Sequence, residues 1–512
     1  MRVEQFLKDA ARLWPERTAL VSGETRLSFE ALDGMSDRLA AGFARLGLRR
    51  HDRAVVMMDN GWEAAVSLFA VLKAGGTAVP VNPSVKAERL GFILRNCEPR
   101  LMVSQVKLAP VVFQAANASA VEPAVVIAGA QSEGPGFVSL DACLSEEDSP
   151  LGTGGVGMDL AFLIYTSGST GEPKGVMLSH GSAEAACTAI AAYLGTGGED
   201  VVGSVLPFSF GYGLFQLLMS VRAGGRLVVE RSFAFPVAVL DVFRAEKVSV
   251  FPLVPTIAAM VLRMDEGVSA LPGLRVITTA AAAMPPERFA ALQARFPQAR
   301  IFSMYGQTEC LRSAYLPPEE LGARPGSVGV AIPGTELLVL DEDGAEAAPG
   351  ATGELAVRSP HLMEGYWGDA EASARALEPL PARPWERVLR TGDLFRRDGD
   401  GFFYFVARKD DVIKSRGEKV PPAAVEAVLL ACPGVSEALV FGLDDPVLGQ
   451  SVQAVVVRAD PNLEERAVLR FCAARLEDFM VPKAVRFAAT LPSTDTGKAS
   501  RRVAADEMRI SA

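Results

Sequence analysis

Residues 165–175 bring together groups that bind polyphosphate. The stretch reads Tyr-Thr-Ser-Gly-Ser-Thr-Gly-Glu-Pro-Lys-Gly and follows an apolar run, 160–164, that is typical of a buried strand. Glycine lets backbone N–H groups approach an anion closely, hydroxyl groups add donors, and lysine adds a positive charge. The spacing differs from that of a Walker A loop. We therefore expect a nucleotide phosphate loop of another kind, whose binding residues are Thr166, Ser167, Gly168, Ser169, Thr170, Gly171 and Lys174.

Composition limits the partners of this loop. The chain has 512 residues, 49% of them hydrophobic, and a formal net charge of −10. It is long enough for two or more domains, and its charge argues against nucleic acid or an anionic membrane as the main partner. The six cysteines form no C-x-x-C pair, and the N-terminus lacks the apolar core of a signal peptide. These features favour a cytoplasmic protein with reduced thiols.

One uncharged stretch, residues 201–221, is long enough to span a bilayer. It contains Pro207 and three glycines, which weaken a helix badly. We therefore expect a buried strand, a loop and the start of a helix here, and no membrane span.

The elements that must position the loop alternate along the chain. Short β-branched runs are followed by alanine-rich helical stretches, which predicts an α/β fold with a largely parallel sheet. From about residue 334, turn-rich strands dominate instead. We expect a large N-terminal domain of α/β subdomains over residues 1–407, with a β-rich subdomain at about 334–407. A charged linker at 408–411 and a small α+β domain at 412–512 complete the predicted organisation.

Several motifs occur in the same order as in one known enzyme family. The loop at 165–175 is followed by Tyr-Gly-Gln-Thr-Glu at 305–309, Thr-Gly-Asp at 391–393 and Thr-Gly-Lys at 496–498. Together they resemble the adenylate-forming superfamily of acyl- and aryl-CoA ligases, carrier-protein adenylation domains and beetle luciferases. The resemblance runs from about residue 160 to the C-terminus and is strongest to AMP-forming acyl-CoA ligases.

The resemblance gives roles to the residues at 305–309. It implies that Tyr305 packs on the adenine and that Gly306 belongs to the same nucleotide site. Thr308 would hydrogen-bond the α-phosphate, and Glu309 would hold Mg²⁺, which prefers hard oxygen ligands. Thr308 and Glu309 are thus expected to act in catalysis.

The later motifs receive roles in the same way. The resemblance implies that Asp393, assisted by Arg408, accepts hydrogen bonds from the ribose hydroxyls. Asp410 falls at the hinge about which the small, mobile domain rotates between two half-reactions. Lys498 is the predicted catalytic lysine, whose ammonium bridges the attacking carboxylate and the α-phosphate. His180 and His361 are interpreted as structural residues.

The acid pocket is expected at two further segments. In the first, carrier-protein adenylation domains for amino acids usually have an aspartate where this chain has Gly211, which favours an acid without an amino group. Ala280 and Ala281 stand where the family has glycines, and Ala407 and Ala424 also depart from the family pattern. The pocket is therefore predicted to be apolar and aromatic, lined by Phe208, Phe210, Gly211, Tyr212, Ala280 and Ala281.

The resemblance implies an ATP- and Mg²⁺-dependent acid–thiol ligase. A carboxylate attacks the α-phosphate of ATP, pyrophosphate leaves, and a thiol then displaces AMP to give a thioester. The acceptor is coenzyme A, or alternatively the phosphopantetheine arm of an acyl or peptidyl carrier protein. A second alternative is an inactive homologue that acts as a binding protein. The expected substrate is a hydrophobic carboxylic acid, aliphatic or aryl, but the sequence does not identify the individual acid, the pathway or the oligomeric state.

Overall fold

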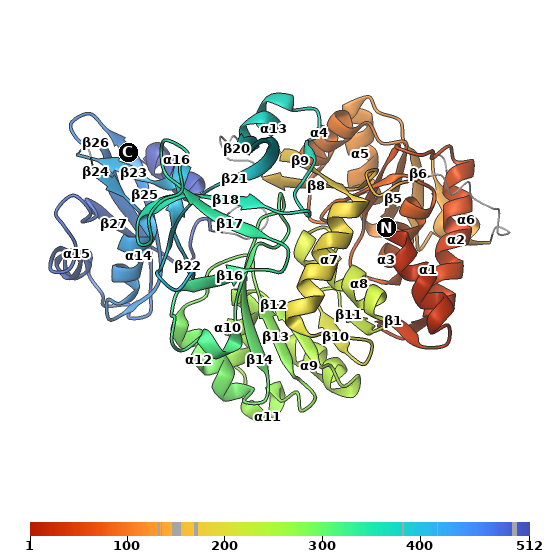
Figure 1. Cartoon of the computed structure of the whole chain (residues 1–512), viewed down its shortest axis with the longest axis horizontal. Helices are drawn as coiled ribbons and strands as arrows, with labels where there is room; N and C mark the ends of the chain where they lie inside the picture. The colour runs from red at the N-terminus through yellow and green to blue at the C-terminus, as the bar shows by residue number, and fades with distance from the viewer. Residues whose placement is uncertain are drawn as a thin grey trace. The chain divides into compact units, whose positions relative to one another are not determined.

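The computed structural model describes residues 1–130, 134, 136–145, 155–167, 173–380, 383–416, 418–493 and 499–511 (Figure 1). Internal contacts divide the chain into two units. The first unit comprises Met1–Leu337 and Val357–Arg390, and the second unit comprises Leu338–Ala356 and Thr391–Ala512. The domain boundaries expected from the sequence stay predictions.

The first unit contains two mainly parallel sheets. Strands in the middle of each are fully buried, as expected where helices cover both faces of a parallel sheet. In spatial order one sheet runs β2 (Thr25–Ser28), β1 (Thr18–Ser22), β11 (Arg226–Val229), β10 (Val201–Ser204), β12 (Val250–Leu253), β13 (Val276–Thr279), β14 (Arg300–Tyr305), β15 (Ala314–Leu316) and β16 (Ser327–Ala331). The other runs β19 (Gly365–Tyr366), β9 (Pro173–Ser179), β8 (Leu160–Ser167), β4 (Thr77–Pro80), β3 (Arg53–Met57), β5 (Leu101–Gln105), β6 (Ala124–Ala128) and β7 (Val138–Ser139).

Two helices lie between these sheets. Helix α7 (His180–Leu194) packs on β8 and β9, helix α8 (Gly211–Ala223) packs on β10 and β11, and the two helices contact each other (Figure 1). The Ser179 hydroxyl caps α7 by accepting a hydrogen bond from the Ser182 amide at 3.1 Å. The other helices of eight residues or more in this unit are α1 (Glu4–Leu13), α2 (Phe29–Arg45), α3 (Trp62–Lys73), α4 (Ala87–Cys97), α5 (Ala109–Ser119), α9 (Pro236–Ala245), α10 (Pro255–Leu262) and α12 (Pro286–Arg295).

The uncharged stretch 201–221 forms β10, a loop and most of α8, as predicted. Across the described ranges, no helix is both long and apolar enough to cross a membrane. All six cysteines are buried and carry free thiols. The predicted α/β fold class is confirmed.

The second unit holds a five-stranded sheet and parts of four strands that precede it. The preceding strands follow in the order β17 (Glu336–Leu340), β18 (Thr352–Arg358), β21 (Arg383–Arg397) and β22 (Phe403–Arg408). The sheet runs β24 (Glu418–Val420), β23 (Ile413–Ser415), β26 (Gly449–Arg458) and β25 (Val435–Asp445), with β27 (Ala484–Ala488) parallel to β26. Helices α14 (Pro422–Leu430), α15 (Glu465–Ala473) and α16 (Arg501–Ser511) complete the unit.

Candidate active site

The Tyr-Gly-Gln-Thr-Glu element begins at the carboxyl end of β14, an edge where α/β sheets commonly bind ligands. Glycine is needed at position 306, where the chain turns back sharply towards residues 311–313. A Cβ at this position would lie 2.5 Å from the carbonyl oxygen of Leu311 and 2.8 Å from the Cα of Arg312. The Ser313 amide also donates to the Tyr305 carbonyl at 2.9 Å. The turn is therefore folded tightly back on itself, with Thr308 and Glu309 near its tip.

Glu309 is positioned by a second segment, residues 361–366. The Tyr366 hydroxyl donates to Oε1 of Glu309 at 2.9 Å, and the Met363 amide donates to the Glu309 carbonyl at 2.8 Å. His361 is fully buried, with Nδ1 2.9 Å from the Cys310 carbonyl oxygen. Burial, and then the neighbouring Glu309, raise the pKa of Tyr366, so the phenol stays protonated as a donor. The burial of His361 and its contact with the Cys310 carbonyl support its interpretation as a structural residue.

Lys174 meets the same tyrosine. It lies at the start of β9, whose partner β19 contains Tyr366, paired with Val176. The Lys174 Nζ is 5.1 Å from the centre of the Tyr366 ring, within the range of a cation–π contact. The fold thus brings Lys174 and Glu309 to one phenol, although they are separated by more than a hundred residues.

The rest of the phosphate loop is only partly described. Thr166 pairs with Lys174 across the β8–β9 hairpin that flanks it. Gly168, Ser169, Thr170 and Gly171, together with the side chain of Ser167, lie outside the described residues. Their predicted role in phosphate binding stays a prediction.

The groups at Glu309 fit a magnesium–phosphate ligand. Glu309 offers a half-buried carboxylate held by one donor, and Lys174 offers a positive charge nearby. In the described part of the chain, no cluster of three or more histidine, cysteine or acidic side chains could hold a metal. A Mg²⁺ ion at Glu309 would take its other oxygens from phosphate and water, as this ion commonly does.

The two predicted pocket segments are joined by a hydrogen bond. Tyr212, in the first turn of α8, has its hydroxyl 2.8 Å from the Thr278 hydroxyl on β13. Phe208 is buried just before the helix, and Phe210 and Gly211 are at its start. Beyond β13, Ala280 is buried and Ala281 is exposed. The structure therefore brings segments 208–212 and 278–281 together.

Ala281 has an unusual backbone conformation for a residue with a side chain. Its φ of 76° lies in the left-handed region, which disfavours residues with a Cβ. A glycine would adopt this conformation without strain. The alanine is therefore accommodated here at some cost in stability.

In the second unit, Asp393 and Arg408 are cross-strand partners in β21 and β22. Arg408 Nε lies 3.3 Å from Oδ1 of Asp393, which is almost fully buried. Glu354, which sequence analysis did not identify, accepts from the Gly392 amide at 3.1 Å and from Lys409 Nζ at 3.0 Å. The predicted ribose pair is thus assembled, and Glu354 supports its turn.

The hinge and the catalytic lysine remain predictions. Asp410 lies in a short 3₁₀ turn, Lys409–Asp411. Lys498 lies outside the described residues. Arg501, just beyond it, binds Asp411 at 2.8 Å and both oxygens of Glu426 at 2.8 and 2.9 Å. Arg501, the first residue of α16, is therefore joined by an ion pair to Asp411, at the end of the predicted hinge.

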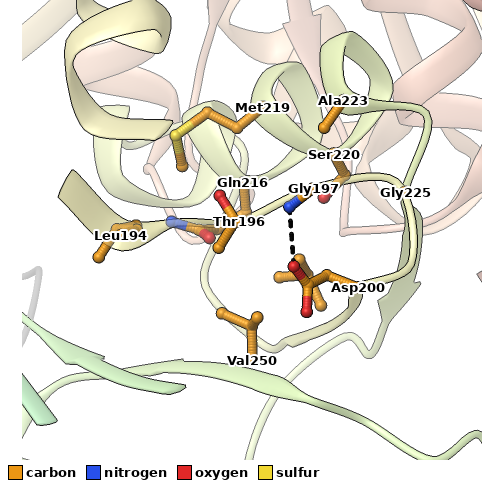
Figure 2. Close-up of a pocket in the computed structure, with 11 residues that line it drawn as sticks. Leu194, Thr196, Gly197, Asp200, Gln216, Met219, Ser220, Ala223, Gly225 and Val250 are labelled. Atoms are coloured by element: carbon orange, nitrogen blue, oxygen red, sulfur yellow. Dashed lines mark hydrogen bonds between the residues drawn. The ribbon is translucent and has the colours of Figure 1, made fainter. Parts of the chain in front are cut away.

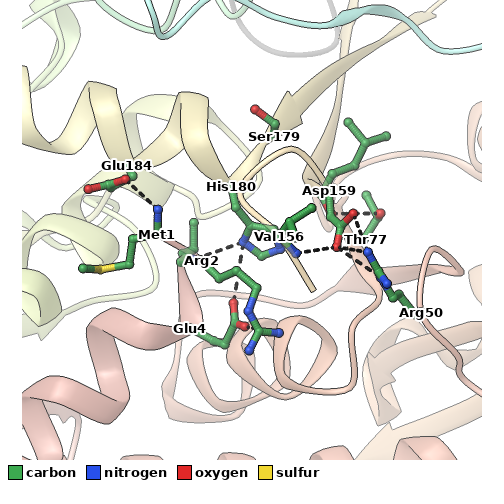
Figure 3. Close-up of polar contacts among 12 residues, drawn as sticks. Met1, Arg2, Glu4, Arg50, Thr77, Val156, Asp159, Ser179, His180 and Glu184 are labelled. Atoms are coloured by element: carbon green, nitrogen blue, oxygen red, sulfur yellow. Dashed lines mark hydrogen bonds and ion pairs between the residues drawn. The ribbon is translucent and has the colours of Figure 1, made fainter. Parts of the chain in front are cut away.

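Two polar clusters away from these residues are structural. In a small pocket beside α8, Asp200 accepts from the Gly197 amide at 2.8 Å, which closes the turn before β10 (Figure 2). Near the N-terminus, Nδ1 of His180 accepts from the Val3 amide at 3.0 Å (Figure 3). Burial lowers the pKa of His180 to about 4, so it is neutral. This supports its interpretation as a structural residue.

Comparison with known proteins identifies the family. The model of the family described as AMP-binding enzyme matches residues 7–367, and that of the AMP-binding enzyme C-terminal domain matches residues 424–498. The chain belongs to the AMP-binding enzyme family. It is an enzyme of the AMP-forming acyl-CoA synthetase class, as the sequence predicted.

Three similar proteins illustrate the range of this family. The chain is 30% identical to indoleacetate–CoA ligase of Aromatoleum aromaticum, with 97% of this chain and 96% of that protein covered. It is 28% identical to tyrocidine synthase 2 of Brevibacillus parabrevis, with 98% of this chain but 13% of that protein covered. The structure resembles o-succinylbenzoate coenzyme A synthetase from Bacillus subtilis in complex with ATP and magnesium ion. That match has a TM-score of 0.85 and 26% identity, and covers 97% of this chain and 98% of the other.

Tyr366 and Glu354 are site residues that sequence analysis missed. Each acts through a partner far away in the sequence, and neither belongs to a charged motif that would have identified it. The Gly-Tyr-Trp run at 365–367 was the available signal for Tyr366.

Proposed function

We propose that this protein is an ATP- and Mg²⁺-dependent ligase that adenylates a hydrophobic carboxylic acid, aliphatic or aryl, and transfers the acyl group to coenzyme A. The observation that supports this most directly is the convergence of Lys174 and Glu309 on Tyr366. It provides a positive charge and an oriented carboxylate where a metal-bound polyphosphate can be held.

The residues divide the work of adenylation. Lys174 attracts the phosphates, Glu309 would be the protein ligand of the metal, and the Tyr366 hydroxyl orients the Glu309 carboxylate. Mg²⁺ would neutralise charge on the phosphate oxygens. Thr308 donates to the α-phosphate, and Asp393 with Arg408 holds the ribose. Lys498 stabilises the charge that builds at phosphorus as the acid attacks and pyrophosphate leaves.

The second step needs only a good leaving group. AMP leaves readily from the acyl adenylate, so a thiol can displace it without a nucleophilic side chain from the protein. Positioning supplies most of the catalysis. Rotation of the small domain about Asp410 would move the lysine loop away from the acyl adenylate and allow the thiol to reach it.

A carrier protein is the alternative acceptor. The similarity to a segment of tyrocidine synthase 2 is a reason to test this alternative acceptor. A titration with coenzyme A against a pull-down with a candidate carrier protein separates the two acceptors.

The first test is ATP–pyrophosphate exchange without any thiol, across short and long fatty acids, benzoates, cinnamates and amino acids. Exchange with one class of acid supports adenylation and identifies the substrate class. Lys498→Ala should lower this exchange by about a hundredfold or more while nucleotide binding is kept. Absence of exchange with every acid, despite tight ATP binding, would favour the inactive homologue.

A further inference from the structure

Arg312 is a charged side chain buried beside the predicted acid pocket. It lies in the turn between β14 and β15 and is only 6% exposed. Its guanidinium carbon is 4.8 Å from the centre of the Tyr212 ring. Because the Arg312 backbone packs against Gly306, the side chain is held between the Tyr-Gly-Gln-Thr-Glu element and the start of α8.

Within the described ranges, this cation has no anionic side chain as its partner. Among the residues that the structure describes, no carboxylate forms an ion pair with Arg312, and its buried Nε has no hydrogen-bond acceptor. Its polar neighbours are Tyr193 and Tyr212. Burial raises the pKa of Tyr212 to about 12, so this phenol is neutral, and burial also raises the pKa of Tyr193. Neither supplies a negative charge.

The rest of the first unit shows how this fold normally treats a buried cation. Lys73 is 5% exposed and lies 2.8 Å from Asp37, with a second ion pair to Asp33. A buried charge left without a partner is strongly destabilising, and a cation–π contact compensates only part of that cost. Arg312 therefore lacks an anionic partner among the residues that the structure describes, and a bound anionic ligand would supply one.

We propose that Arg312 binds a second carboxylate of the acid substrate, so that the preferred substrate is a dicarboxylic acid with an apolar carbon skeleton. This inference rests on the proposed function. Tyr212 places Arg312 beside the predicted acid pocket. Its ring contacts the Arg312 guanidinium, and its hydroxyl bonds to Thr278, just before Ala280 and Ala281. Arginine is also the side chain best suited to grip a carboxylate, through two parallel hydrogen bonds.

The test compares matched acids with one or two carboxylates. ATP–pyrophosphate exchange is measured with hexanoate against adipate, octanoate against suberate, and benzoate against terephthalate. The wild type should prefer the diacid of at least one pair. Arg312→Met should lower kcat/KM for that diacid by about a hundredfold and change kcat/KM for its monoacid by less than about threefold. Arg312→Lys should recover part of the loss.

A control variant separates this effect from loss of any arginine. Arg300 also lies over an aromatic ring, that of Phe302, but it is exposed at the other end of β14. Arg300→Met should leave both acids of a pair unaffected. Arg312→Met should also raise the Tm of the ligand-free protein, because it removes an unpaired buried charge. A purely structural arginine would lower it.

Other outcomes overturn the proposal. A wild type that prefers the monoacid in every pair would do so. A rise in the KM for ATP that is equal for all acids would show that Arg312 faces a nucleotide phosphate instead. Calorimetry of each diacid with the wild type measures binding without catalysis. It therefore distinguishes a failure of the Arg312 proposal from a failure of the proposed function. Diacid binding that Arg312→Met abolishes, in a protein without exchange activity, would support the pocket while refuting adenylation.

Discussion

At the level of single residues, the site depends on a phenol that orients a carboxylate. Tyr366 donates to Glu309 and packs against Lys174, so it supports both charged groups. Tyr366→Phe keeps the ring but removes the donor. We expect a rise of about tenfold in the Mg²⁺ concentration needed for half-maximal adenylation, because groups that orient a metal ligand typically contribute 10–100-fold. A magnesium titration of ATP–pyrophosphate exchange measures this.

Tyr404 provides the control for that variant. Its hydroxyl donates to Asp398 at 3.1 Å in the second unit, so Tyr404→Phe removes a similar bond at a distant place. The magnesium titration of Tyr404→Phe should match that of the wild type. An unchanged titration for Tyr366→Phe as well would show that Glu309 does not need its phenol partner.

These residues also show what the sequence alone could predict. Lys174, Glu309 and Asp393 lie in motifs of fixed spacing, and the structure places each beside a charged or polar partner. Tyr366 and Arg312 were missed because their partners come from other elements. A tyrosine or arginine within a strand or turn has no local pattern that distinguishes a site residue from a packing residue.

At the level of elements, the start of α8 is held by a close backbone approach. A Cβ at Gly213 would lie 2.2 Å from the Pro207 carbonyl oxygen and 2.5 Å from that of Leu206. Gly213→Ala must push apart the helix and the segment that precedes it. We expect a loss of about 3 kcal/mol in the free energy of unfolding, at the upper end for overpacking. Urea denaturation measures this loss.

Gly211 is a matched control, two residues earlier in the same helix. A Cβ there would meet only the Cδ2 of Leu311, at an ordinary contact distance of 3.7 Å. Gly211→Ala should therefore stay within about 0.5 kcal/mol of the wild type, since alanine also favours the helix. Equal losses for the two variants would refute the role of the close approach.

The same segment shows why elements were easier to predict than contacts. Its lack of charge and its glycines correctly predicted a buried strand, a loop and a helix start at 201–221. Nothing in that pattern could predict that Tyr212 bonds to Thr278, because this contact depends on a sheet order in which β12 lies between β10 and β13. Periodicity describes each element, whereas the sheet order decides which elements meet.

At the scale of the whole molecule, two buried histidines couple stability to pH. Burial lowers the pKa of both His180 and His361 to about 4, from an ordinary value of 6.5. Above pH 6.5 both are neutral in the folded and unfolded chain. As the pH falls from 6.5 to 4, the unfolded chain takes up protons that the folded chain does not. The free energy of unfolding should therefore fall by about 3 kcal/mol for each histidine.

Variants at single histidines test this sign and assign it. His361→Asn should reduce the slope of unfolding free energy against pH between 6.5 and 4.5, because it removes one of the groups that bind a proton in the unfolded chain but not in the folded chain. The slope is the proper readout, since the variant also loses the bonds of His361 to Cys310 and Thr335 at every pH. His51 is exposed, and its φ of 69° suits asparagine, so His51→Asn should leave the slope unchanged. Equal slopes for the wild type and His361→Asn would contradict a buried, neutral His361. They would also argue against His361 as a support, through the Cys310 carbonyl, for the turn that contains Glu309.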